Sequence, residues 1–139
     1  MAQILRLRLV AAIALYVTSL TLPGLHLEGH DPAYGWDILM RGWLGIAILE
    51  IAWISNILFA VALVATLMEK PVHAAYIATA AFLIGLTSLR STIWVFHHAP
   101  ITGLGSGFYV WMAAFAILAL GSFAARNERS PTTGPDVFG

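Results

Sequence analysis

Residues 38–68 read ILMRGWLGIAILEIAWISNILFAVALVATLM, and only Arg41 and Glu50 carry formal charge within this stretch. A helix crosses the hydrocarbon core of a membrane with about 20 mostly apolar residues. Three further apolar stretches lie at 4–22, 72–96 and 107–125. The pattern predicts an all-α, polytopic membrane protein with four transmembrane helices in an up-down bundle.

The composition of the whole chain also favours a membrane protein. Of 139 residues, 60% are hydrophobic and 10% are charged, whereas about a quarter of a soluble domain is charged. Lys and Arg balance Asp and Glu at seven each, so no basic field attracts nucleic acid. The absence of cysteine excludes disulfides, cysteine-ligated zinc and iron–sulfur clusters. We expect one transmembrane domain over 1–126 and a flexible polar cytoplasmic tail over 127–139.

Charged residues in the short loops predict the orientation of the spans, because cytoplasmic loops carry an excess of Lys and Arg. The basic residues that fall on one side are Arg6, Arg8, Lys70, Arg126 and Arg129. The opposite side has Arg41. Both termini are therefore predicted to be cytoplasmic, in a multi-pass protein of the bacterial inner membrane. Aromatic side chains gather at membrane interfaces, and the predicted outer belt consists of Trp36, Trp43, Trp94, Tyr109 and Trp111.

Glu50 lies inside the predicted second span, where a charged side chain costs about 3 kcal/mol on insertion scales. The tight turn at Lys70 and Pro71 makes the second and third spans an antiparallel hairpin. A hairpin centred there places Glu50 level with Ser91, one residue from Arg90. We therefore predict an intramembrane ion pair between Glu50 and Arg90. The polar side chains expected to support this pair are Asn56, Ser88 and Ser91.

Three roles are open for the predicted Glu50–Arg90 pair. It fixes the register of the hairpin, relays a proton or ion, or makes a polar contact with another subunit. The first role is favoured because a matched pair compensates its own charges, and the relay is disfavoured because the spans lack a long chain of polar groups. Small residues let membrane helices approach closely, and those expected at helix contacts are Gly42, Gly45, Gly85, Ala113 and Ala116.

Four of the five histidines map to the predicted outer side of the membrane. Imidazole is a common ligand for zinc, copper and iron. His26 and His30 share one face if their loop is helical. A metal site is therefore a further hypothesis, with the candidate ligands His26, His30, Asp31, His97 and His98. The sequence requires no cofactor, and a b-type haem is disfavoured because the histidines lie at or beyond the ends of the spans.

Three sequence blocks resemble those of a family of small uncharacterised bacterial four-helix integral membrane proteins. The blocks are GWLG at 42–45, AWISN at 52–56 and GLGSGFYVW at 103–111. The family pattern is Gly-Trp-Leu-Gly, Ala-Trp-x-Ala-Asn-Pro and Gly-x-Gly-Tyr-Tyr-x-Trp, so the chain departs from it at Ser55 and Ile57. The resemblance covers about two thirds of the chain. It implies four spans in a bacterial inner membrane and no particular activity.

The sequence contains no Ser/His/Asp order, catalytic carboxylate pair or nucleotide signature that points to an enzyme. A four-span chain of 15.0 kDa also leaves little room for a buried substrate pocket. We therefore expect a non-catalytic accessory or partner-binding subunit of a larger membrane complex, in contact with lipid and with other subunits or copies of itself. The alternatives are a periplasmic-face metal-binding or redox-linked protein that uses the histidines, and an immunity-type membrane protein.

Overall fold

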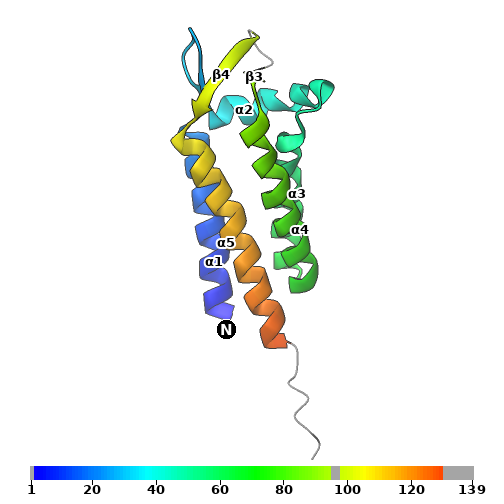
Figure 1. The fold of residues 1–139 in the computed structure, drawn as a ribbon. Helices are drawn as coiled ribbons and strands as arrows, with labels where there is room; N and C mark the ends of the chain where they lie inside the picture. Colours follow the sequence, from blue (N-terminus) through cyan, green and yellow to red (C-terminus); the bar gives the residue numbers. More distant parts are fainter. Residues whose placement is uncertain (1, 95–97, 130–139) are drawn as a thin grey trace, which may run out of the picture.

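The computed structural model describes residues 2–94 and 98–129, which are mostly helical (Figure 1). The α-helices are α1 (Ala2–Leu20), α2 (Gly35–Arg41), α3 (Ile54–Leu67), α4 (Pro71–Gly85) and α5 (Ser106–Arg129). The 3-10 helices are η1 (Gly42–Ile48), η2 (Ile51–Trp53) and η3 (Leu86–Arg90). The strands are β1 (Pro23–Leu27), β2 (Ala33–Tyr34), β3 (Ile93–Trp94) and β4 (Ala99–Leu104).

Three of the helical segments are long and apolar enough to cross a membrane. These segments are Gln3–Leu20, Pro71–Arg90 and Ser106–Arg129. A fourth apolar helical segment, Ile51–Leu67, is shorter. The predicted helical character is therefore confirmed, but the structure supports three spans by length rather than four. It also contains a small sheet that an all-α protein would lack.

The predicted continuous span over 38–68 is wrong, because the chain breaks into α2, η1 and η2 before α3 begins. A Cβ atom on Gly42 would lie 2.9 Å from Cδ1 of Trp53, so the glycine lets this indole fold back against α2. The Trp53 indole N–H donates to the Leu39 carbonyl at 2.9 Å. Leu49 then adopts a left-handed conformation with φ 65°, and the Glu50 N–H donates to the Gly45 carbonyl at 2.9 Å. These contacts reverse the chain where a straight helix was expected.

The four strands form an antiparallel sheet in the order β2-β1-β4-β3. Strands β1 and β4 come from the two loops at the same end of the bundle, and Leu25 pairs with Leu104. Strand β3 occupies residues predicted to belong to the third span, which ends as a helix at Arg90. Between β4 and α5, Gly105 lies so close to the Pro23 carbonyl that a Cβ atom would overlap it.

Figure 1 shows that the sheet closes one end of the helices, with α2 beneath it, while α1 begins and α5 ends at the other. We name these the sheet end and the terminal end. Helix α5 packs against both α1 and α4, and α4 also packs against α3. Alanines fill most of these contacts, and the fully buried ones are Ala12, Ala62, Ala74, Ala75, Ala78, Ala81 and Ala114. The Phe59 ring of α3 contacts both α1 and α5, because it stacks on Tyr16 and packs against Phe115.

Helix α1 begins and α5 ends at the same end of the bundle, as in an up-down arrangement of four helical segments (Figure 1). At the terminal end, the Arg129 guanidinium donates to the Glu69 carbonyl at 2.7 Å, which ties α5 to the turn between α3 and α4. Residues 127–129, which were predicted to belong to the flexible tail, are part of α5. The remainder of the predicted tail lies outside the described residues.

Candidate functional site

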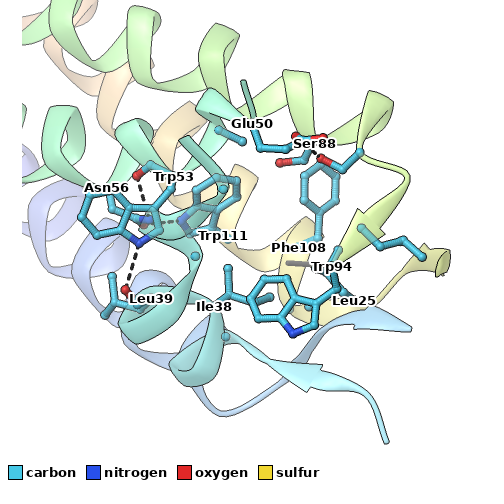
Figure 2. Close-up of a pocket in the computed structure, with 18 of the residues that line it drawn as sticks. Leu25, Ile38, Leu39, Glu50, Trp53, Asn56, Ser88, Trp94, Phe108 and Trp111 are labelled. Carbon is cyan, nitrogen blue, oxygen red and sulfur yellow. Dashed lines mark hydrogen bonds between the residues drawn. The ribbon is translucent and has the colours of Figure 1, made fainter. Parts of the chain in front are cut away.

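A partly enclosed cavity of about 110 Å³ lies at the sheet end, where the helices meet the sheet (Figure 2). A cavity needs about 10–15 Å³ to hold one water molecule. The space therefore accommodates several waters or one small organic molecule. The sequence led us to expect little room for a buried pocket, and the structure has this cavity at the sheet end.

Glu50 supplies the charge in the cavity wall. Its backbone lies between the left-handed Leu49 and the start of η2, which turns its side chain inward, and the residue is half-buried. The Ser91 hydroxyl, just after η3, donates to Oε2 of Glu50 at 2.6 Å. Of the cavity-lining residues in the described part of the chain, Glu50 is the one with a formal charge.

The structure places Ser91, rather than Arg90, on the Glu50 carboxylate. The predicted hairpin correctly placed Glu50 level with Ser91, but the Arg90 side chain is exposed. Within 2–94 and 98–129, the ion pair found is Arg129–Glu69 at the terminal end, and Glu50 makes none with Arg90. The reason is that η3 ends at Arg90 and the chain becomes extended at Ser91, which points this next side chain to Glu50. The Ser88 side chain also lines the cavity.

Asn56 does not support Glu50 but organises a second polar cluster on another part of the wall (Figure 2). Its Oδ1 atom accepts hydrogen bonds from the Tyr16 hydroxyl at 2.8 Å and the Trp111 indole N–H at 2.9 Å. Its Nδ2 group donates to the Trp53 carbonyl at 3.1 Å. One amide thereby joins α1, α3 and α5 beside the cavity. Tyr16 was missed, although a lone phenol within the first apolar stretch is a visible signal for a buried hydrogen bond.

Aromatic rings form much of the remaining wall. The aromatic lining residues are Trp53, Trp94, Phe108 and Trp111, and the large aliphatic ones are Leu20, Leu25, Ile38, Leu39, Ile93 and Ile101. Trp94 and Trp111 were assigned to the outer interfacial belt, but Trp94 is only 9% exposed because β3 holds it under the sheet with Leu25. The other belt residues, Trp36, Trp43 and Tyr109, are exposed.

The small residues predicted to lie at helix contacts are distributed over several environments. Gly42 and Gly45 line the cavity, while a Cβ atom on Gly85 would lie 2.9 Å from Sδ of Met112 on α5. Ala113 and Ala116 are only partly buried. The small residues of α5 that are buried are Gly107, Ala114, Ala119, Gly121 and Ser122.

The histidine hypothesis finds no support among residues 2–94 and 98–129, where no three His, Asp or Glu side chains gather to hold a metal ion. His26 lies on β1 and His30 follows it in a turn, so the helical spacing that would align them is absent. Asp31 follows in the same connection, and His98 precedes β4. His97 lies outside the described residues.

Comparisons with known proteins found no relative of this chain. No protein-family model matches the chain, and no curated protein or solved structure does so either.

Proposed function

We propose that this chain is a four-span integral membrane protein that binds a small, largely apolar molecule in the sheet-end cavity. The observation that carries the proposal is the cavity itself, which combines aromatic and aliphatic walls with a few placed polar groups. Ligand sites in proteins have this composition, and they often lie between the helices of a bundle.

The proposed topology uses α3, with the preceding η2, as the fourth span beside the three longer helices. Its 17 residues, Ile51–Leu67, are at the lower limit for crossing a bilayer. Lys70, Arg126 and Arg129 lie at the terminal end, so the positive-inside rule makes that end cytoplasmic. The cavity then opens near the outer leaflet of a bacterial inner membrane.

The cavity wall contains polar side chains, Asn56 and Glu50, that an apolar helix contact would not need. Asn56 accepts from both the Trp111 indole N–H and the Tyr16 hydroxyl, while the Glu50 carboxylate accepts a hydrogen bond from the Ser91 hydroxyl. Burying a polar group costs free energy unless it is hydrogen-bonded. A site that retains a half-buried carboxylate beside open space is suited to a ligand that completes its hydrogen bonds.

Quenching of tryptophan fluorescence tests the proposed function. Para-bromobenzyl alcohol is titrated into the protein in lipid nanodiscs, where its bromine quenches the cavity indoles. We expect a saturable component that Ala52→Phe removes, because Ala52 lines the cavity. Ala47→Phe is the matched control, since Ala47 is exposed on η1. Quenching that never saturates, or that is the same in both variants, contradicts the proposal.

A second candidate function is the binding of a partner subunit in the membrane. It is favoured by large apolar side chains exposed on the segment that interrupts the second apolar stretch, namely Trp43, Ile46, Ile48, Leu49 and Ile51. Leu49 is 86% exposed and lies at the tip of this segment. Large exposed apolar patches mark interaction sites or lipid contacts.

Purification in mild detergent tests the second candidate. We expect a partner subunit, or another copy of the chain, to co-migrate with the wild type and to be lost with Leu49→Ser. Leu120→Ser is a control because Leu120 is also exposed but lies on α5. A lone species for the wild type contradicts a stable partner-binding role.

A further inference from the structure

Resting on the proposed function, we propose that the sheet-end cavity selects a small organic cation, an amine or ammonium group on a single-ring apolar body. Its charge lies against the Glu50 carboxylate, and its apolar body contacts the surrounding aromatic rings. The juxtaposition of one carboxylate and several aromatic side chains in one cavity carries this inference.

The Glu50 carboxylate retains hydrogen-bonding capacity toward the cavity. An ionised carboxylate offers about four acceptor positions, and the Ser91 hydroxyl occupies one of them. In the described part of the chain, no cationic side chain pairs with it. A charged group inside a membrane protein is costly unless a partner compensates it. An ammonium group on the ligand supplies both the opposite charge and the missing N–H donors.

The aromatic walls favour the same ligand class. A cation is attracted to the face of an aromatic ring within about 6 Å of its centre, most strongly for tryptophan, and desolvation increases this attraction. Figure 2 shows the Phe108 ring beside Ser88 and Glu50, with Trp94 and Trp111 facing the same space. Ammonium groups are recognised in proteins by aromatic residues arranged around a charge, and this cavity provides both components.

The lining residues disfavour the other simple ligand classes. An anion meets the negative charge of Glu50, and the described lining residues include no Lys, Arg or His to offset it. A hard metal ion takes about six or more oxygen ligands, whereas the ionisable or hydroxyl groups here are Glu50, Ser88, Ser91 and Ser19. Ser19 is buried and already donates to the Tyr16 carbonyl. The volume of about 110 Å³ suits one ring and a short arm.

Three probes of nearly equal shape test the charge preference. They are para-bromobenzylamine, para-bromobenzyl alcohol and para-bromobenzoate, which are cationic, neutral and anionic at neutral pH. Each is titrated into the full chain in nanodiscs of neutral lipid, and saturable tryptophan quenching gives its dissociation constant. We expect the amine to bind about tenfold more tightly than the alcohol, and the benzoate to bind more weakly than both.

Two variants assign this preference to the cavity charge. Glu50→Gln keeps the shape of the side chain and removes its charge, so the amine and the alcohol are expected to bind equally. Arg90→Gln is the matched control, because Arg90 precedes Ser91, the hydrogen-bond donor to Glu50, but is itself exposed, and the tenfold preference is expected to remain. Equal binding of amine and alcohol by the wild type overturns the cation inference while leaving the proposed function intact.

Other outcomes separate the two proposals. If none of the probes gives saturable quenching, the proposed function itself fails. A preference that persists in Glu50→Gln overturns the role of Glu50. If that variant does not fold, the wild-type preference is measured from about 0.1 M to 1 M salt, because partly buried charge pairs are screened much less than exposed ones. Loss of the preference at high salt then overturns the inference.

Discussion

The sheet end and the terminal end of this bundle are built from the same helices, but their interiors differ. Toward the terminal end, alanines such as Ala74 and Ala75 allow the helices to pack closely. At the sheet end, α3 and α4 are preceded or followed by 3-10 helices, and Trp94, Phe108 and Trp111 surround a cavity. The difference lies in what surrounds the open space: aromatic rings and the sheet surround the cavity at the sheet end, whereas the pocket at the terminal end is lined by charged side chains such as Arg8, Glu69 and Arg129.

Charged residues follow the same division. At the terminal end, Arg129 and Glu69 form an exposed pair with 3.6 Å between Nη2 and Oε2. An exposed pair of this kind contributes about 0–1 kcal/mol. At the sheet end, Glu50 is half-buried and accepts a hydrogen bond from Ser91. The Glu69 carboxylate is therefore paired with a cationic side chain, whereas the Glu50 carboxylate faces a cavity in which a ligand could contact it.

The largest effect is expected from a substitution at the close backbone contact between Gly105 and Pro23 at the sheet end. Gly105→Ala is expected to lower the free energy of unfolding by about 3 kcal/mol, because its Cβ atom overlaps the Pro23 carbonyl and overpacking is costly. Gly103→Ala is the control, since a Cβ atom there has nothing within 4 Å. Thermal unfolding in detergent compares the two. Equal melting temperatures contradict the close approach of β1 to the start of α5.

The Asn56 cluster is expected to have the next largest effect. Asn56→Leu removes the acceptor of Tyr16 and Trp111 and leaves both donors unsatisfied, at a cost of about 2 kcal/mol. Tyr16→Phe removes one of these hydrogen bonds and should cost about 1 kcal/mol. The double variant should be non-additive, because both residues belong to one network. Chemical unfolding of the four proteins checks this, and strict additivity contradicts a shared network.

Replacing the hydrogen-bond donor to Glu50 distinguishes the observed contact from the ion pair that the sequence suggested. Ser91→Ala is expected to lower the free energy of unfolding by about 1.5 kcal/mol, since hydrogen bonds to charged groups are stronger than neutral ones. Arg90→Ala should change it by less than about 0.5 kcal/mol, because Arg90 is exposed. A larger loss for Arg90→Ala, absent in a Glu50→Gln background, would restore the ion pair.

The smallest effects compare one glycine from each half. Gly85→Ala should cost about 1 kcal/mol, because its Cβ atom comes within 2.9 Å of Met112 and within 3.3 Å of two rings. Gly121→Ala should stabilise α5 by about 0.5 kcal/mol, since its Cβ atom meets the flexible Arg8 side chain and alanine favours a helix. Melting temperatures that change in the same direction contradict the difference in packing.

The helices were predictable because they depend on local composition. Long apolar stretches identify α1, α4 and α5, and the turn at Lys70 and Pro71 brings Glu50 level with Ser91. Both results follow from the length of a helix and the geometry of a hairpin. Neither requires knowledge of contacts between distant segments.

The sheet end was not predictable because its structure depends on distant partners. Strand β1 contains Pro23 and Gly24, which read as a turn, and it becomes a strand only by pairing with β4 far along the chain. Likewise, residues 42–53 are as apolar as a membrane-spanning helix, but the hydrogen bond from the Trp53 indole to the Leu39 carbonyl bends this segment into 3-10 turns. The cavity arises between these segments, so no local pattern indicates it.

Thiol labelling tests the difference between the two ends most directly, because the chain has no cysteine. Ser88→Cys introduces a thiol in the cavity wall, and Ser122→Cys introduces one among buried residues of α5 nearer the terminal end. A small methanethiosulfonate reagent is applied to both variants in nanodiscs. We expect Ser88→Cys to react at least about tenfold faster than Ser122→Cys, and para-bromobenzylamine to slow the reaction of Ser88→Cys. Equal rates for the two variants, or a Ser88→Cys thiol that does not react, would contradict an open cavity at the sheet end.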